Sequence, residues 1–410
     1  MLNVDEAIER ILTDIKTMPT ENISIYDAWE RVLANDIYAD MNLPPFANSS
    51  MDGYAVRFED IEGATADHPI KLPVSMDLPA GRAPRMPLEP GAAARIMTGA
   101  PIPEGADVVI PVEQTDSDWE NQPGMPEYVQ IFESAARGSN IRLPGEDVQA
   151  GQLILSTSTE LRPQDIGILA ALGQGDLSVY QKPKVAILSS GDELVSVYDP
   201  LTPGKIRDTN SFTLTGLVKA LGADVINFPI ARDNKDSIRA MFYSTVAKKP
   251  NMIITSAGVS VGAADLIKKF LDEMGQVDFW RINMRPGKPV AYGNLADIPF
   301  FGLPGNPVSA MVTFDVLVRP ALLKMMGKTE KLPIRQAKLK QSVKSDGRRS
   351  YIRVKLEYND DGQLWASTTG TQSSGALMSM VLADGLLVLP ENLTEAHEGD
   401  VFPVRLLREV

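Results

Sequence analysis

The chain of 410 residues contains no cysteine and only two histidines. The absence of cysteine excludes disulfides, thiolate nucleophiles and cysteine-based zinc or iron–sulfur sites. With His68 and His397 alone, a metal site built on several imidazoles is not expected. Long apolar runs are also missing, so the sequence predicts no membrane-spanning helix.

Positive charge is scarce relative to negative charge, with 40 Lys and Arg against 53 Asp and Glu and a formal net charge of -13. Nucleic-acid-binding proteins usually carry a basic excess, because phosphate contacts supply much of their affinity. Nucleic acid is therefore not expected as a partner, and a small anion needs a local cluster of cations and backbone N–H groups. The N-terminal MLNVDEAIERIL lacks the apolar core of a signal peptide, which favours a cytoplasmic location.

The composition is otherwise that of a globular protein, and the length predicts two to four domains. Helical spacing of apolar residues in Val4–Ile15 predicts an amphipathic helix. Segment 43–150 is dense in Pro and Gly with short apolar stretches, which predicts a β-rich domain with long loops.

The segment from Pro183 to Met326 has a different pattern, in which short apolar runs alternate with helical ones. This alternation is typical of βαβ units around a mostly parallel, doubly wound sheet, so the central domain is predicted to be α/β. After Lys331 strand patterns return, and Asn359–Gly362 is typical of a hairpin turn. The last segment therefore predicts a small barrel or sandwich.

Three loops rich in small residues follow predicted strands of the α/β segment, at 189–193, 256–265 and 303–309. Ligands of open α/β sheets bind beyond the carboxyl ends of the strands. Small residues allow close backbone approach, and we expect each loop to open a helix whose N-terminal N–H groups attract an anion. One such loop is more often a tight turn only, but three in one domain favour a phosphate site. The candidate ligands are Ser190, Gly191, Gly258, Ser260 and Gly262.

Cations and carboxylates accompany these loops. Residues 280–289 read WRINMRPGKP, in which two prolines and a glycine hold Arg281, Arg285 and Lys288. Such a turn fixes cations more firmly than a solvated face requires, which favours a phosphate or another oxyanion. Loop carboxylates are singly typical of caps, turns or the surface, but beside a phosphate site they could hold Mg²⁺. These carboxylates are Asp52, Asp147, Glu193, Asp208, Asp233 and Asp265.

Gly258–Gly262 also matches the G-x-S-x-G motif of serine hydrolases, with Ser260 as the nucleophile. A catalytic triad would then need His397. That histidine lies in a turn-like stretch of the C-terminal β segment, so an exposed loop histidine is the better interpretation.

Ordered motifs along the whole chain carry a family resemblance. They are PPFANSSMDGYAV, RIMTGAPIPEGADVVIPVE, LPGEDV, SSGDEL, DTN, TSAGVSVGAAD, MRPGKP, FGLPGNPVSA and TGTQSSG. In these motifs and in their order, the sequence resembles the molybdopterin molybdenumtransferase (MoeA) family, which is related to the E domain of gephyrin. The resemblance covers essentially all 410 residues.

The resemblance implies insertion of molybdenum from molybdate into adenylylated molybdopterin, with release of AMP in a Mg²⁺-dependent step of molybdenum cofactor synthesis. It further implies a homodimer and the upstream molybdopterin adenylyltransferase as a partner. The implied α/β domain comprises 1–20 and 174–330, and the β-rich domain 43–150. A linker or dimer domain comprises 21–42 and 151–173, and the C-terminal β domain 331–410.

Site residues follow from the resemblance position by position. The implied catalytic residues are Asp52, Thr98, Asp147, Asp265 and Lys288, and the implied metal ligands are Glu193, Asp233 and Asp265. Arg281, Arg285, Pro304 and Pro307 match substrate-binding positions, while Arg348 and Ser374 match a molybdate-binding pair. A non-catalytic scaffold, as in gephyrin's receptor clustering, is an alternative that the intact acidic and cationic motifs argue against.

Overall fold

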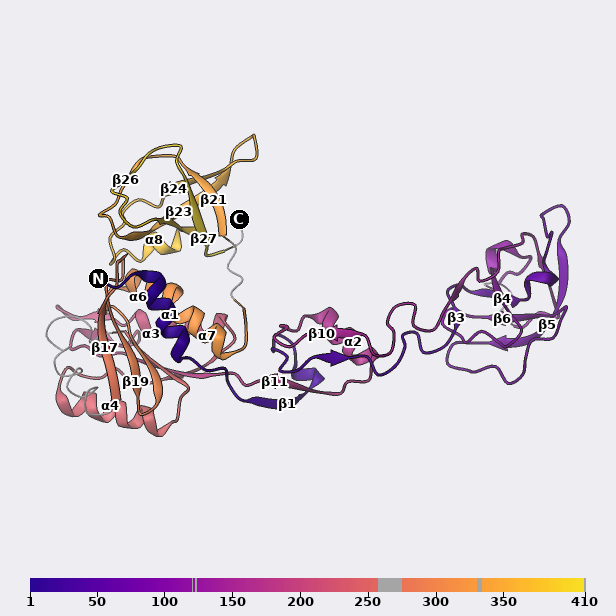
Figure 1. The fold of residues 1–410 in the computed structure, drawn as a ribbon, viewed down its shortest axis with the longest axis horizontal. Helices are drawn as coiled ribbons and strands as arrows, with labels where there is room; N and C mark the ends of the chain where they lie inside the picture. Colours follow the sequence, from indigo (N-terminus) through magenta and orange to yellow (C-terminus); the bar gives the residue numbers. More distant parts are fainter. Residues whose placement is uncertain (120, 122–123, 257–274, 330–333, 409–410) are drawn as a thin grey trace.

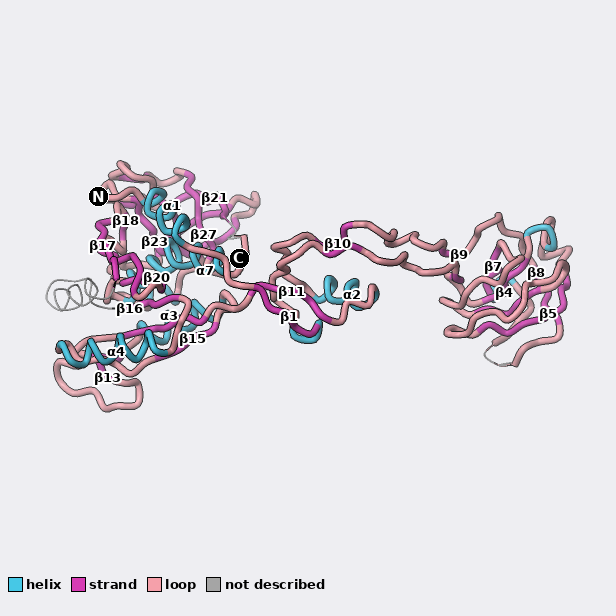
Figure 2. Tube along the Cα trace, turned by 60° about the horizontal axis from the view of Figure 1, so that its bottom comes forward, coloured by secondary structure: helices cyan, strands magenta, loops and turns pink. Residues whose placement is uncertain are grey.

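The computed structural model describes residues 1–119, 121, 124–256, 275–329 and 334–408. The molecule is elongated: a domain of strands and helices lies against a C-terminal barrel at one end, and a β-rich domain forms the other end (Figure 1). A small linker domain lies between them, and the chain passes through it twice (Figure 2). No helix in the described ranges is long and apolar enough to cross a membrane.

The α/β domain is built on a sheet with the strand order β15-β12-β16-β20-β19-β17. The first four strands are mutually parallel, and β19 and β17 continue the sheet antiparallel. The strand bounds are β12 Lys184–Leu188, β15 Asp224–Asn227, β16 Met252–Thr255, β17 Gly275–Arg281, β19 Pro289–Leu295 and β20 Ile298–Gly302. The prediction of a mostly parallel sheet is thus confirmed.

Helices cover both faces of this sheet, which explains why its central strands are apolar throughout. One face packs against α1, α3, α6 and α7, and the other against α4. The bounds are α1 Val4–Asp14, α3 Asn210–Ala220, α4 Lys235–Ala247, α6 Pro307–Thr313 and α7 Arg319–Met325, with a π-helical turn at Phe314–Val318 joining the last two. The layers are those of a doubly wound fold.

Helix α1 lies at the start of the chain, yet it packs on the central domain. Asn3 caps it by accepting a 2.8 Å hydrogen bond from the N–H of Asp5. Its buried stripe of Val4, Ala7 and Ile11 faces the same core as α7. The predicted amphipathic helix is therefore present, and burial of this stripe holds the N-terminus beside the sheet.

The C-terminal strands close into a barrel, because β23 pairs with both β24 and β25. In the order β23-β24-β21-β27-β25 the last strand pairs with the first, so the domain is a barrel and not a sandwich. The bounds are β21 Ile334–Leu339, β23 Arg349–Tyr358, β24 Leu364–Thr368, β25 Gly385–Leu389 and β27 Val401–Leu406, with β22 Val343–Lys344, β26 Glu395–Ala396 and helix α8 Met378–Val381. One short strand of the α/β domain, β18 (Met284–Arg285), pairs parallel with β23 and joins the two domains.

The distal domain is a sheet in the order β7-β4-β6-β5-β8 with buried apolar clusters on its two sides. Its strands are β3 Asn48–Ser49, β4 Gly53–Val56, β5 Ile70–Leu78, β6 Ala93–Ile96, β7 Val108–Pro111, β8 Tyr128–Ile131 and β9 Ile141–Arg142, with 3₁₀ turns at Phe58–Asp60 and Val112–Gln114. The linker domain contains β1 Thr20–Ser24, β2 Ile37–Tyr38, β10 Leu153–Leu155, α2 Pro163–Ala171, β11 Asp176–Tyr180 and a 3₁₀ turn at Ile25–Asp27. Its outgoing and returning strands pair as β1 with β11 and β2 with β10.

Candidate functional site

The carboxyl ends of β15, β12, β16 and β20 lie at one edge of the sheet because these strands are parallel. Two hydrogen bonds join the segments that leave this edge. The hydroxyls of Ser189 and Ser256 lie 3.1 Å apart, and the amide of Asn210 donates to the carbonyl of Gly305 at 2.7 Å. The first and third predicted loops therefore both border this edge.

Four candidate residues of the second loop, Gly258, Ser260, Gly262 and Asp265, lie outside the described residues. Their predicted roles in phosphate and metal binding stay predictions.

The first loop follows β12 but does not open a helix, so that part of the prediction is wrong. The chain instead forms β13 (Leu194–Val195), which pairs parallel with β14 (Ile206–Arg207), and α3 begins only at Asn210. Pro200, Pro203 and Gly204 interrupt the intervening segment, and proline and glycine oppose helix continuation there. The backbone N–H groups of this loop are therefore not the first turn of a helix.

Carboxylates gather around this first loop. Asp192 and Asp233 cross-bond, each backbone N–H lying 3.3–3.4 Å from the other's carboxylate. Burial, together with the negative charges of Asp192 and Glu193, raises the pKa of Asp233 above its ordinary value. Asp233 Oδ1 and the buried hydroxyl of Ser190 have no hydrogen-bond partner within the described residues. These atoms are candidates for contact with a ligand.

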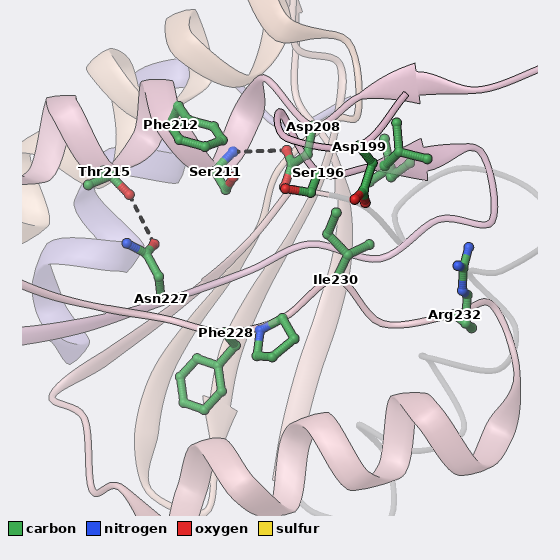
Figure 3. A pocket seen from close by; sticks show the side chains of 13 residues that line it. Ser196, Asp199, Asp208, Ser211, Phe212, Thr215, Asn227, Phe228, Ile230 and Arg232 are labelled. Atoms are coloured by element: carbon green, nitrogen blue, oxygen red, sulfur yellow. Dashed lines mark hydrogen bonds between the residues drawn. The ribbon is translucent and has the colours of Figure 1, made fainter. Parts of the chain in front are cut away.

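Next to this loop, a cleft of about 600 Å³ opens at the carboxyl end of β15. Figure 3 shows the rings of Phe212 and Phe228 on its wall, with Asp208 and Asn227 contributing polar groups. Asp208 accepts a hydrogen bond from the N–H of Ser211 at 3.1 Å, which ties it to the start of α3. The cleft combines aromatic surface with hydrogen-bonding groups, as small-molecule sites do.

The third loop turns through buried Pro304 into α6, where Pro307 takes the first helical position. The backbone N–H of Val308 in the first turn donates to the carbonyl of Ser374 at 3.2 Å. Ser374 belongs to the C-terminal domain, so the barrel reaches the loop edge of the α/β domain here.

Residues 281–288, called here the cation loop, connect β17 with β19. A 2.9 Å hydrogen bond from the N–H of Ile282 to the carbonyl of Lys288 closes the loop. Gly287 is required within it: its φ is 109°, and a Cβ there would lie 2.4 Å from Thr313 Oγ1. The side chains of Arg281, Arg285 and Lys288 are exposed. The predicted turn is therefore pressed against α6 while it presents its cations outward.

The barrel contributes further cations to the same place. Arg348 donates to the carbonyl of Met284 at 3.1 Å, and its other guanidinium nitrogens bond to Asp346. Asp346 also lies 3.7 Å from Arg285. The two guanidinium groups lower the pKa of Asp346, Arg348 more than Arg285, so this carboxylate is ionised at neutral pH.

Arg353 was not identified as a candidate from the sequence. In the structure this residue is only 1% exposed. Its guanidinium donates to Ser379 Oγ at 3.2 Å and to the carbonyl of Ser373 at 3.1 Å, and no carboxylate of the described residues forms an ion pair with it. Burial, with a smaller contribution from the charge of Arg285, lowers its pKa to about 10, so it remains protonated. The signal in the sequence was an arginine inside the apolar run Tyr351–Val354.

Three predicted catalytic residues lie in a different part of the chain. Asp52 accepts hydrogen bonds from Thr98 through the backbone N–H at 2.7 Å and the hydroxyl at 2.8 Å. Asp147 lines a second cleft with Pro44 and Asn48. This group belongs to the distal domain and its base, at the far end of the molecule from the sheet (Figure 1). One chain alone therefore does not bring it to the α/β site.

His397, the histidine required by the hydrolase interpretation, lies exposed in a turn of the barrel, where its backbone N–H donates to Asp400. Within the described ranges, no three histidine, aspartate or glutamate side chains form a metal-binding group. The described geometry therefore offers cations and paired carboxylates, while Ser260, the nucleophile of the hydrolase interpretation, lies outside the described residues.

Comparison with known families matches the chain in three successive segments. Residues 2–173 match the family described as MoeA N-terminal region (domain I and II). Residues 186–324 match the family described as probable molybdopterin binding domain, and residues 336–407 match the MoeA C-terminal region (domain IV).

Whole proteins agree with this segment order. The chain is 40% identical over 379 residues to molybdopterin molybdenumtransferase 2 of Mycobacterium tuberculosis, covering 90% of each chain. It is 37% identical to the molybdopterin molybdenumtransferase of Haemophilus influenzae, covering 98% of each. A solved molybdopterin biosynthesis MoeA protein from Pyrococcus horikoshii superposes over 100% of both chains with a TM-score of 0.83 and 31% identity. The chain therefore belongs to the MoeA family of molybdopterin molybdenumtransferases.

Proposed function

We propose that this protein inserts molybdenum into adenylylated molybdopterin, taking the metal from molybdate and releasing AMP. The observation that carries the proposal is the cation cluster between the sheet edge and the barrel, defined here as Arg285, Lys288, Arg348 and Arg353. Relatives of this chain are named for the same transfer.

The oxyanion would be held by this cation cluster. Arg353 supports the assignment because it is buried without an ion pair among the described residues, which is costly unless an anionic ligand compensates it. Its neighbour Ser373 precedes Ser374, whose carbonyl bonds the first turn of α6. A tetrahedral oxyanion placed here would lie next to the loop edge, where ligands of α/β sheets bind.

Magnesium would be held on the substrate phosphates by Asp233 with Asp192 or Glu193. Mg²⁺ commonly uses one or two carboxylates, with phosphate oxygens and water completing its shell. The residues fit this demand, because Asp233 Oδ1 is unpaired within the described chain and lies beside two further acids; burial and these acids together raise the pKa of Asp233. When bound, the ion would neutralise charge on the phosphoanhydride, and Asp265 is the predicted third contributor.

The nucleotide half of the substrate would occupy the cleft beside β15. Its volume of about 600 Å³ accommodates a nucleoside, Phe212 offers a ring face, and Asp208 suits a ribose hydroxyl. The cleft also adjoins the Asp192–Asp233 pair. A single ligand could thus place its base in the cleft and its phosphates at the paired carboxylates.

Asp52, Thr98 and Asp147 would reach the site from a second copy of the chain. The linker domain leaves Tyr26 95% and Trp29 60% exposed, although domains of this size usually bury such rings. A homodimer that covers this surface would explain the exposure. It would also allow the distal domain of one copy to approach the sheet edge of the other.

The decisive experiment measures AMP release from adenylylated molybdopterin with Mg²⁺, with and without molybdate. We expect release that depends on molybdate and yields active cofactor. Arg353→Gln should raise the molybdate concentration needed by at least about tenfold, because a charged hydrogen-bonding partner is lost.

Arg335→Gln provides a matched control, because this arginine is exposed on β21 of the same barrel. Its molybdate dependence should equal that of the wild type. AMP release that ignores molybdate, or an Arg353→Gln protein with unchanged dependence, would contradict the assignment.

A further inference from the structure

Asp346 stands among the cations that are proposed to receive the oxyanion. Its carboxylate bonds Nε and Nη2 of Arg348, with both oxygens 3.1 Å from Nε. It also lies 3.7 Å from Nη1 of Arg285. One carboxylate thus bridges two guanidinium groups that come from different domains.

This contact leaves Arg348 with little capacity for another anion. Nε and Nη2 face Asp346, and Nη1 donates to the carbonyl of Met284. An oxyanion that uses the fork of Arg348 must therefore take the place of the carboxylate. Arg353 differs, because within the described residues its guanidinium meets only Ser373 and Ser379.

The side chain of Asp346 can leave while its backbone stays in place. Ser345 donates from its N–H to the carbonyl of Thr394 at 2.8 Å, and the carbonyl of Gly347 accepts from Asn392 at 2.8 Å. These bonds hold the turn on both sides of Asp346, and the carboxylate itself adds one 3.3 Å hydrogen bond from the backbone N–H of Arg348. Since that side chain is 38% exposed, rotation about its own bonds would carry it into solvent.

The formal charges favour such an exchange. The cation cluster of Arg285, Lys288, Arg348 and Arg353 carries four positive charges, and Asp346 offsets one of them. An incoming tetrahedral dianion that displaces Asp346 brings two negative charges in place of one. A dianion attracts both guanidinium groups more strongly than one carboxylate does, but it must displace that carboxylate first.

We propose that the carboxylate of Asp346 competes with the incoming oxyanion for the guanidinium groups of Arg285 and Arg348 and thereby weakens oxyanion binding. The inference rests on the proposed use of this cluster for molybdate. Asp346 would thus be a residue that sets substrate affinity without contacting the reacting atoms.

The test is calorimetric titration of sodium molybdate into the full-length protein, together with the molybdate dependence of AMP release. Asp346→Asn should bind molybdate about threefold to tenfold more tightly at low salt, since partly exposed charge interactions are of this modest size. The gain should shrink as ionic strength rises. Asp346→Glu keeps the negative charge and should stay near the wild-type affinity.

Asp361→Asn is the matched control, because this exposed aspartate lies in the hairpin turn between β23 and β24. It removes the same charge away from the cluster and should leave molybdate affinity unchanged.

Weaker binding by Asp346→Asn would overturn the inference, because Asp346 would then serve to orient Arg348. Unchanged affinity beside a wild type that binds molybdate would overturn this inference alone. If neither protein binds molybdate, the oxyanion part of the proposed function falls with it.

Discussion

Burial changes the behaviour of individual charged side chains in this molecule, and Asp233 and Arg353 show it in opposite ways. The pKa of Asp233 is raised because a carboxylate loses solvation beside two other acids. The pKa of Arg353 is lowered to about 10, mainly by desolvation, yet the group stays charged at neutral pH. In both residues the fold disfavours the charged form of the side chain, as is common among ligand-binding residues.

Asp233→Asn should stabilise the protein at neutral pH while it lowers activity. The folded-state pKa of Asp233 lies above the unfolded value, so ionisation disfavours folding once pH rises through that interval. Removing the ionisable group should raise Tm at pH 7 by roughly 1–3 °C, with the difference vanishing below about pH 4. Thermal unfolding followed from pH 3.5 to 8 in the absence of divalent ions measures this.

The control for this variant is Asp278→Asn, which removes an exposed carboxylate on β17. Its Tm should follow the wild-type pH profile. An Asp233→Asn protein that is less stable at pH 7, or fully active with Mg²⁺, would contradict the role assigned to Asp233.

Phe212→Ala tests the nucleotide cleft through the ring face that lines it. Stacking of a base on an aromatic ring contributes about 1–3 kcal/mol, so AMP binding should weaken roughly tenfold or more. Equilibrium dialysis with AMP measures the change. Tyr243→Ala, at an exposed aromatic on α4, should bind AMP as the wild type does; equal losses in both variants would argue against the cleft.

At the scale of elements, the cation loop is held from two sides. Leu2 pairs with Ile282 at the start of the chain, and β18 pairs with β23 of the barrel. Glu391 links both sides, because its carboxylate accepts 2.9 Å hydrogen bonds from the amides of Asn3 and Asn283. The orientation of Arg285 therefore depends on contacts made by the N-terminus and the barrel.

Glu391→Ala should loosen the loop without unfolding the barrel. Hydrogen bonds to a charged group contribute about 1.5–3 kcal/mol, so amide exchange at residues 282–285 and 349–350 should accelerate by roughly tenfold or more. Hydrogen–deuterium exchange with mass spectrometry measures this, with Glu398→Ala at an exposed turn as the control. Protection that is unchanged at the loop but lost across the barrel would show a general effect on stability instead.

In the whole molecule, two groups of candidate residues lie far apart. Asp52, Thr98 and Asp147 belong to the distal end, while the sheet edge and the cation cluster belong to the other end (Figure 1). The chain crosses the linker domain twice, through the β1–β11 and β2–β10 pairs, and this domain separates the two ends. The proposed site shared between two copies would use both groups.

Mixing two inactive variants should restore activity if the site is shared. Asp52→Ala removes a distal residue and Arg285→Ala a residue of the cation cluster, so only a mixed dimer contains one site with both intact. Random reassortment of equal amounts would recover about a quarter of wild-type AMP release. Activity is measured after joint refolding, and size exclusion reports the oligomer.

Trp29→Glu provides the complementary control, because a charge on the exposed linker surface should disrupt a dimer formed there. With this change in both chains, no recovery is expected. Recovery that persists in monomeric protein would contradict the shared site.

The sequence by itself determined which kinds of site the composition excludes, which segments form helices or strands, and the order of the motifs. The parallel strands, the covered amphipathic helix and the hairpin at Asn359–Gly362 follow from local periodicity and turn residues, which act over a few neighbouring positions. The three loops of small residues and the cation loop could be located in the sequence for the same reason. The first loop was misjudged because its Gly and Ser pattern is equally compatible with a turn into β13.

Only the tertiary structure decided which distant residues meet. Closure of the barrel through β23 and β25, its contact with the cation loop, and the burial of Arg353 all depend on pairings far apart in the chain. Burial and charge proximity are properties of the packed whole, and a linear pattern does not encode them locally. For the same reason, the bridge from Asp346 to Arg285 and the separation of Asp52 from the sheet edge became visible only in three dimensions.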